Sequence, residues 1–352
     1  MLWLSPELLQ NQRVKAAVLH GREDLRIEEL APARLGPGEV RIKVEAALTC
    51  GTDLKVFKRG YHAKMIVPPA PFGHELAGTI AEVGPQVSGW KPGDRVVVAN
   101  SAPCGICSFC LRGQENLCDD LIFLNGAYAE SIVVPARVVA RNMLQIQDTT
   151  GFRSAALTEP LACVVKGIED ARLQTGQKVL VLGAGPIGLM FVALARSLDC
   201  GVSVAGRGDA RLSRARKLGA EKIIDACSEP DWMNACENTG RFDVVIEAIG
   251  QPATWEAAVT SVRKGGLVNF FGGCPSGTRI SLDAGLLHYS NLTLLASFHH
   301  TPRTIRRALG FIEKGVIRVE DFVDGECLLD ELPALFKGMA AGNRAVKTSV
   351  KV

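Results

Sequence analysis

Between residues 178 and 198 the sequence has the pattern of a buried strand, a glycine-rich turn and an apolar helix. The strand is Lys178 to Leu182, and the helix follows from Leu189 to Leu198. In a Gly-x-Gly-x-x-Gly turn the first glycine makes the tight bend and the second admits a pyrophosphate to the helix N-terminus. The third lets helix and strand pack closely. The pattern predicts a dinucleotide site at Gly183, Gly185, Pro186, Ile187 and Gly188.

Strands and helices continue to alternate after this turn. Four more strands are predicted, at Val202 to Ala205, Lys222 to Ile224, Val244 to Ile246 and Leu267 to Phe271. Regular alternation indicates an α/β domain whose parallel sheet has right-handed crossovers. Polar or glycine-rich turns end these strands, and we therefore predict that Gly250 and Gly272 also contact the cofactor.

The end of the second predicted strand, Val202 to Ala205, bears on the choice of cofactor. An NAD-binding fold carries an acid there for the ribose hydroxyls, whereas this chain has Gly206, Arg207 and another glycine. Glycine leaves room for a 2′-phosphate, and the forked guanidinium of Arg207, or of Arg211 one helical turn on, can bind it. We predict NADP over NAD. Asp209, which we expect to cap the next helix, is the ribose ligand if NAD is preferred instead.

Four cysteines lie close together in the pattern C-x2-C-x2-C-x7-C. Four thiolates can close a tetrahedral zinc site, and such a site is structural because no position stays open for a substrate. The alternatives are four incidental thiols or two disulfides, which the spacing opposes. The pattern predicts a structural zinc bound by Cys104, Cys107, Cys110 and Cys118.

A second set of candidate zinc donors is spread along the chain: a thiol, an imidazole and two carboxylates. They are Cys50, His74, Glu75 and Glu159. Taken singly, each has an ordinary explanation. Cys50 could be a core thiol, His74 and Glu75 a polar surface pair, and Glu159 an exposed carboxylate at a helix end.

Length and composition exclude several classes of protein. The 352 residues suffice for two domains of ordinary size. A net charge of +3 is too small to indicate nucleic acid or a membrane surface as partner, and no apolar run approaches the roughly 20 residues of a membrane span. The first residues resemble a short helix or arm rather than a signal peptide. Eleven cysteines, an odd number, oppose a secreted disulfide scaffold and favour a reducing cytoplasm.

Four motifs in order give the chain a resemblance to the zinc-dependent medium-chain dehydrogenases, and within them to the sorbitol-type polyol and threonine dehydrogenases. The motifs are Cys50-Gly51-Thr52-Asp53, Gly73-His74-Glu75-x-x-Gly78 with Gly84 and Val87, the four-cysteine lobe and the Gly183 turn. The resemblance covers nearly the whole chain beyond the first dozen residues. It implies a GroES-like, β-rich catalytic domain at 1–157 with a zinc lobe at about 100–120, a Rossmann domain at 158–296, and a return to the catalytic domain at 297–352.

The resemblance also implies roles for the scattered donors. It makes Cys50 and His74 ligands of a catalytic zinc and puts Glu159 where simple alcohol dehydrogenases have a second cysteine. Glu75 would be a fourth or alternate ligand, and Asp53 would orient His74 through its other ring nitrogen. Together with the four-cysteine site, this gives an expectation of two zinc ions per chain.

The implied activity is hydride transfer between NADP and a secondary alcohol of a polyol, sugar or cyclitol, which becomes a ketone. Thr52 matches the hydroxyl that takes the substrate proton, but Lys55 stands where many members have a histidine, which leaves the outer relay open. The alternatives are a threonine or simple secondary-alcohol dehydrogenase and an NAD-preferring polyol dehydrogenase. A further alternative is an inactive NADP- or zinc-binding regulatory protein.

Substrate contacts are expected in the cleft that such a fold implies. The residues predicted to line it are Thr52, Phe57, Phe123, Glu159, Phe298 and His299. The polar groups of His299 and Glu159 could bond additional hydroxyls, although His299 could also be a surface residue near the domain hinge. We expect a small-molecule alcohol or ketone as partner and a homo-oligomer, either a dimer or a tetramer.

Overall fold

The computed structural model describes residues 13–62, 64–229, 231–238, 241–343 and 345–352, and the helix or arm expected at the N-terminus lies outside these ranges. Contacts divide the chain into two compact units. The first unit is Met1–Glu159 with Val323–Val352, and the second is Pro160–Phe322. No helix in the described ranges is both long and apolar enough to cross a membrane.

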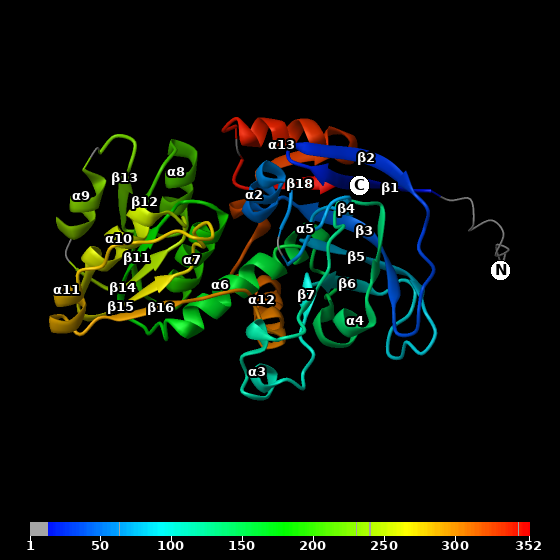
Figure 1. Cartoon of the computed structure of the whole chain (residues 1–352), viewed down its shortest axis with the longest axis horizontal. Helices are drawn as coiled ribbons and strands as arrows, with labels where there is room; N and C mark the ends of the chain where they lie inside the picture. The colour runs from blue at the N-terminus through cyan, green and yellow to red at the C-terminus, as the bar shows by residue number, and fades with distance from the viewer. Residues whose placement is uncertain (1–12, 63, 230, 239–240, 344) are drawn as a thin grey trace. The chain divides into compact units, whose positions relative to one another are not determined.

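The first unit is built on a seven-stranded sheet of order β10-β6-β5-β3-β18-β17, in which β9 also pairs with β3 (Figure 1). A sheet β2-β1-β4 and a short pair β7-β8 complete its strands. The strands are β1 (Val14–Gly21), β2 (Asp24–Leu30), β3 (Val40–Leu48), β4 (Ala70–Pro71), β5 (Leu76–Val83), β6 (Arg95–Val98), β7 (Ser101–Ala102), β8 (Ile122–Phe123), β9 (Ser131–Val134), β10 (Met143–Gln145), β17 (Gly325–Leu328) and β18 (Thr348–Lys351). The helices are α2 (Gly51–Arg59), α3 (Ser108–Leu111), α4 (Ala136–Asn142), α5 (Phe152–Ala155) and α13 (Leu332–Ala340), with short 3-10 turns η1 (Glu115–Leu117) and η3 (Leu329–Glu331).

Strand β3 is the centre of this unit. Its side chains alternate, because the apolar ones along it are buried and Lys43 between them is exposed. The C-terminal strand β18 pairs antiparallel with β3, with Ser349 opposite Leu48. This pairing brings the last residues of the chain beside the segment that follows β3, where Thr49 and Cys50 lie.

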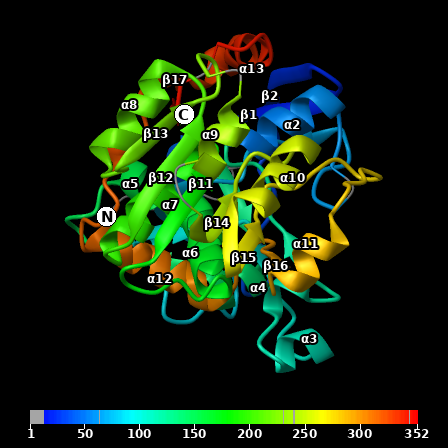
Figure 2. The same ribbon diagram turned by 90° about the vertical axis from the view of Figure 1, so that its left-hand side faces the viewer.

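The second unit contains a six-stranded parallel sheet of order β13-β12-β11-β14-β15-β16. Helices lie on both of its faces: α7 and α8 pack against β11 to β13, and α10 packs with α9 and against β14 and β15 (Figure 2). The strands are β11 (Lys178–Leu182), β12 (Gly201–Gly206), β13 (Lys222–Asp225), β14 (Phe242–Glu247), β15 (Val262–Phe270) and β16 (Thr293–Ala296). The helices are α6 (Thr158–Asp170), whose first two residues belong to the first unit, α7 (Pro186–Ser197), α8 (Asp209–Lys217), α9 (Trp232–Asn238), α10 (Pro252–Ser261), α11 (Ala284–Tyr289) and α12 (Pro302–Glu313), with the 3-10 turn η2 (Val319–Asp321).

The sheet confirms the predicted α/β alternation, and two details differ from the sequence prediction. The strand β16 was not predicted. The residue that caps α8 is Gly208, so Asp209 lies inside the first turn of the helix rather than at its cap. An acidic side chain is favourable at either position, because the N-terminal end of a helix carries partial positive charge.

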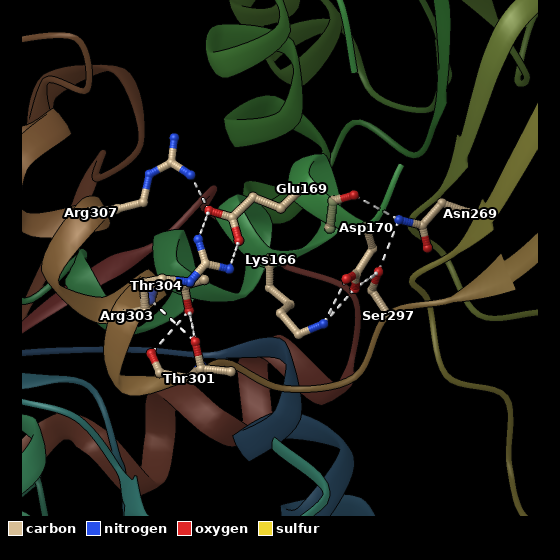
Figure 3. Close-up of polar contacts among 10 residues, drawn as sticks. Lys166, Glu169, Asp170, Asn269, Ser297, Thr301, Arg303, Thr304 and Arg307 are labelled. Carbon is tan, nitrogen blue, oxygen red and sulfur yellow. Dashed lines mark hydrogen bonds and ion pairs between the residues drawn. The ribbon is translucent and has the colours of Figure 1, made fainter. Parts of the chain in front are cut away.

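The chain returns to the first unit at Val323 rather than at the expected residue 297. The helix α12 explains the difference, because polar contacts fix it to α6 within the second unit (Figure 3). Arg303 bonds the Glu169 carboxylate at 2.9 Å, and Arg307 bonds the same carboxylate. Beside this cluster, the Oγ of Ser297 donates to Asp170 at 2.7 Å. Residues 297–322 therefore complete the second unit before the chain leaves it.

Candidate active site

Cys50 stands at the N-terminus of α2, where it caps the helix. Its Sγ accepts a hydrogen bond from the Thr52 backbone nitrogen at 3.4 Å. The fold thus holds the Cys50 sulfur, a possible metal ligand, beside Thr52, whose side chain is half-buried in the first turn.

His74 lies just before β5 and is buried, and its ring is oriented by a carboxylate. Its Nδ1 lies 2.8 Å from Asp53 Oδ1, and the other oxygen, Oδ2, accepts from the Tyr128 hydroxyl at 2.6 Å. Because an ionised carboxylate only accepts, Nδ1 carries a proton toward Asp53, and Nε2 is the ring nitrogen that a metal ion could take in exchange for a proton. Burial lowers the pKa of His74, but the charges of Asp53 and Cys50 outweigh this and raise it well above its ordinary value.

Glu75 forms a buried ion pair that the sequence pattern did not reveal. Both of its oxygens contact the Lys347 ammonium, at 2.7 and 2.5 Å, across a sequence separation of 272 residues. Lys347 also donates to the carbonyl oxygen of Thr49 at 2.8 Å. Burial lowers the pKa of Lys347, but the charge of Glu75 outweighs this and raises it, so the ammonium stays charged.

Glu159 is buried in the first turn of α6, not exposed at a helix end. Pro160 follows it inside the same turn, where a missing backbone N–H breaks no helical hydrogen bond. Burial raises the pKa of the Glu159 carboxyl to about 7, while the positive charge of His74 opposes the shift. The charges of His74 and Glu75 therefore act on the Glu159 carboxyl group.

Three of the predicted donors are brought together. One donor atom each of Cys50, His74 and Glu75 lies within 4.8 Å of the others. Glu159 is outside this triple, although its pKa responds to His74, Glu75 and Lys347. Thiolate, imidazole and carboxylate are zinc donors, and the orientation of His74 by Asp53 is the support that such a ligand needs. The residues therefore fit a zinc ion.

The four-cysteine lobe also fits zinc. Donor atoms of Cys104, Cys107, Cys110 and Cys118 lie within 4.8 Å of one another. The Sγ atoms of Cys104 and Cys110 are 3.9 Å apart, as are those of Cys107 and Cys118. A Zn–S bond of about 2.3 Å gives a tetrahedron edge of about 3.8 Å, whereas a disulfide would need about 2.05 Å. Backbone N–H groups lower the pKa of Cys107 to about 6, which favours its metal-binding thiolate.

The glycine-rich turn has the predicted geometry. Gly183 has φ +115°, and a Cβ on Gly188 would lie 1.8 Å from the carbonyl oxygen of Gly183. The space beside Gly185 is open, and this residue caps α7 with Pro186 in the first turn. Backbone N–H groups at the start of α7 can therefore bind a phosphate, as the sequence predicts.

Gly206 has a different role from the predicted one. A Cβ there would lie 2.6 Å from the Cβ of Ala184, so glycine is required by packing against the glycine-rich turn. The missing side chain is thus no evidence of room for a 2′-phosphate. Arg207 is exposed just after β12, and Arg211 is half-buried in the first turn of α8. The prediction of NADP therefore depends on these two guanidinium groups.

The predicted substrate residues are not alike in their surroundings. Phe57 is buried in the core, with its ring 5.5 Å from that of Phe336, so we no longer assign it to the substrate. Helix α2 is amphipathic, and Phe57 lies on its buried face. Phe123 is half-buried on β8. In the second unit Phe298 is exposed, and His299 has φ +61°, an uncommon conformation for a residue other than glycine.

Comparisons with known proteins agree with this geometry. A model of the alcohol dehydrogenase GroES-like domain matches residues 36–144, and one of zinc-binding dehydrogenases matches residues 186–314. Sorbitol dehydrogenase of Bacillus subtilis is 32% identical over 349 residues, 96% of this chain and 97% of that protein. L-threonine 3-dehydrogenase of Pyrococcus abyssi is 34% identical over 289 residues, 80% of this chain and 79% of that protein. The structure of a zinc-binding dehydrogenase from Sinorhizobium meliloti bound to NADP matches with a TM-score of 0.89 at 28% identity, covering 97% of this chain and 100% of that chain.

These matches define an oxidoreductase with a GroES-like domain and a Rossmann domain. The chain belongs to the zinc-dependent medium-chain dehydrogenases, in the branch that holds sorbitol and threonine dehydrogenases. The family and fold predicted from the sequence are confirmed. Lys347 and Tyr128 were missed, although a lysine beside the apolar C-terminal strand was a signal that could have been followed.

Proposed function

We propose that this chain transfers hydride between NADP and a secondary alcohol of a polyol, sugar or cyclitol, forming the ketone, with zinc at the Cys50 site. The observation that supports this most is the donor set of half-buried Cys50 with buried His74 and Glu75, next to Thr52 in the first turn of α2, with a second buried carboxylate at Glu159. Buried charges of this number are costly unless a metal or a partner compensates them.

In this proposal Cys50, His74 and Glu159 hold the zinc, whose contribution when bound is Lewis acidity toward the alcohol oxygen. NADP supplies the hydride chemistry, and the protein supplies position and field. Thr52 accepts the proton of the substrate hydroxyl. Lys55, one turn further along α2, is exposed, so the proton can pass from Thr52 to solvent on that side.

The charge balance assigns Glu75 a supporting role. Cys50 thiolate and Glu159 carboxylate together match the two charges of zinc, while the Glu75 charge is already balanced by Lys347 at 2.7 Å. Glu75 therefore acts as an alternate donor within reach of the metal, and Lys347 neutralises the Glu75 carboxylate when it does not bind the metal.

The substrate and the cofactor are tested together with a panel of alcohols and both cofactors. We expect polyols or cyclitols to exceed 2-propanol and 2-butanol in kcat/KM, because a site that bonds extra hydroxyls rejects analogues lacking them, by up to about 10⁴-fold. NADP should exceed NAD. Activity should disappear after zinc removal with a chelator and return on adding zinc.

The second candidate is a threonine or simple secondary-alcohol dehydrogenase. It is favoured by the L-threonine 3-dehydrogenase relative, whose identity to this chain, 34%, is as high as that of the sorbitol enzyme at 32%. L-threonine therefore belongs in the panel. Better kcat/KM with threonine or with 2-butanol would replace the polyol proposal, and better kcat/KM with NAD would replace the NADP proposal.

We also propose that the chain acts as a homo-oligomer in the cytoplasm. Strand β16 forms one edge of the six-stranded sheet, and an edge strand can pair with another chain. Thiolates at two metal sites suit a reducing compartment. Light scattering of the purified protein would give the oligomeric state directly.

A further inference from the structure

A buried carboxylate that the proposed chemistry does not use lies at the end of β14. Glu247 is fully buried, and its Oε1 accepts three hydrogen bonds from the segment that follows it. The donors are the backbone nitrogens of Ile249 and Gly250, both at 2.9 Å, and the Thr254 hydroxyl at 2.7 Å. The side chain thus fixes the β14–α10 loop, residues 248–251, from within.

Glu247 also holds the loop that follows β15. Its carbonyl oxygen accepts from the backbone nitrogens of Phe271 at 3.0 Å and Gly272 at 2.7 Å. The two loops touch closely, because a Cβ on Gly250, which has φ +82°, would lie 2.5 Å from the carbonyl oxygen of Gly273. The Glu247 side chain therefore holds residues 248–251, its backbone carbonyl holds residues 271–273, and the side chain acts on the second loop only through the contact between the two loops.

These two loops border the glycine-rich turn. Ala248 donates its backbone N–H to the Leu182 carbonyl at 2.9 Å, and a Cβ on Gly183 would lie 2.9 Å from the Ile249 side chain. Strand β14 adjoins β11 on the side opposite β12, so the strand order reverses here. Dinucleotides bind outside the carboxyl ends of the strands at such a point, one nucleotide on each side of it.

The adenosine side is the β12 side, because the ribose position lies at the end of that strand. The loops after β14 and β15 therefore face the other nucleotide. Burying a carboxylate is costly, and the three neutral donors that offset this cost all come from residues 249–254, so this segment is shaped around the acid. Burial raises the pKa of Glu247, and the hydrogen bonds from Gly250, Thr254 and Ile249 oppose this.

We propose that Glu247 is a positioning residue, whose side chain holds the β14–α10 loop, and through it the adjoining residues 271–273, in the shape that receives the non-adenine half of the dinucleotide. The proposal rests on the proposed cofactor site. It predicts an effect of Glu247 on that half of the ligand alone, with the adenosine half, bound near Arg207 and the start of α7, left unchanged.

The test is Glu247→Gln in the full-length protein, with the Kd measured by calorimetry for NADP, NAD and adenosine 2′,5′-bisphosphate. Glutamine keeps the shape and one acceptor but places an NH₂ group toward the Gly250 N–H, which now lies 3.2 Å from Oε2. We expect the affinity for the better dinucleotide to fall by about tenfold, the effect of one lost charged hydrogen bond. Binding of the adenosine fragment should stay within about twofold, since the proposal leaves that half of the site untouched.

Two further variants make the result interpretable. Glu256→Gln on α10 is the matched control, because its carboxylate bonds the Ser281 backbone nitrogen at 2.9 Å rather than either loop, and it should leave each Kd unchanged. Thr254→Val removes one of the three donors while keeping the acid, and a threefold or larger loss confined to the dinucleotide supports the proposal if Glu247→Gln does not fold.

Unchanged dinucleotide affinity in both Glu247→Gln and Thr254→Val would overturn the proposal. An equal loss for dinucleotide and fragment would overturn it too, because it would indicate a general structural role. Failure of the wild-type protein to bind either dinucleotide would instead count against the proposed cofactor site itself.

Discussion

At the scale of single residues, the chain from Tyr128 through Asp53 to His74 decides how the predicted zinc ligand is held. Tyr128 is buried, and burial and the Asp53 charge raise its pKa well above the ordinary value, so its hydroxyl remains a donor. One hydroxyl therefore fixes the carboxylate that fixes the imidazole. Such support by groups beyond the ligands commonly changes metal affinity by about 10- to 100-fold.

Tyr128→Phe tests this support. We expect zinc to leave the Cys50 site about tenfold faster in a chelator competition, with a fall in kcat, because Asp53 loses the 2.6 Å hydrogen bond. Tyr289→Phe is the control, since Tyr289 is 83% exposed. Zinc release and kcat equal to those of the wild type would show that Asp53 needs no hydroxyl to hold His74.

Arg207 carries the predicted preference for NADP. Arg207→Ala should lower kcat/KM for NADP by about tenfold or more while leaving that for NAD nearly unchanged, because a charged hydrogen bond to the 2′-phosphate is lost. Arg216→Ala, at an exposed position in the last turn of the following helix α8, is the control. An equal loss of kcat/KM with both cofactors would show that Arg207 does not distinguish NADP from NAD. Gly206→Asp is unsuitable, since its Cβ would collide with Ala184.

At the scale of secondary-structure elements, the pair of Glu75 and Lys347 joins the loop before β5 to the residue before β18. Lys347→Met leaves a buried carboxylate without its partner, which should cost about 3–5 kcal/mol of unfolding free energy in urea. The double variant Glu75→Gln/Lys347→Met should recover most of this loss. Lys15→Met, which breaks the exposed pair with Asp330, is the control and should change stability little. A stable single variant would mean that Glu75 is not charged in the folded protein.

The four-cysteine lobe is the second element with a testable role. Cys107→Ser should leave one zinc per chain instead of two and lower Tm, because structural zinc contributes directly to folding energy. The remaining protein should keep a substantial part of its kcat when measured below its new Tm. Metal analysis that still finds two zinc ions would show that the lobe does not bind one.

At the scale of the whole molecule, the sequence predicts what is local and misses what is distant. The strand–helix alternation and the Gly183 turn are local patterns, and the structure has both. The ion pair of Glu75 with Lys347 joins residues 272 apart, and Tyr128 lies 75 residues from Asp53. The late return at Val323 depends on contacts between α12 and α6 that no local pattern encodes. The packing role of Gly206 likewise depends on Ala184, which belongs to another segment of the chain.

Above all, we propose that His74 and Glu159 hold a zinc ion that the reaction needs and that the binding of NADP does not need. The most direct test measures zinc content, kcat and NADP affinity in His74→Ala and Glu159→Ala beside the wild type. We predict two zinc ions per chain in the wild type and one in each variant. Turnover should fall by far more than tenfold, beyond ~1.4 kcal/mol in barrier, with NADP affinity nearly intact. The contradicting result is a variant that keeps two zinc ions and more than about a tenth of the wild-type kcat. Such a kcat corresponds to a barrier change below ~1.4 kcal/mol.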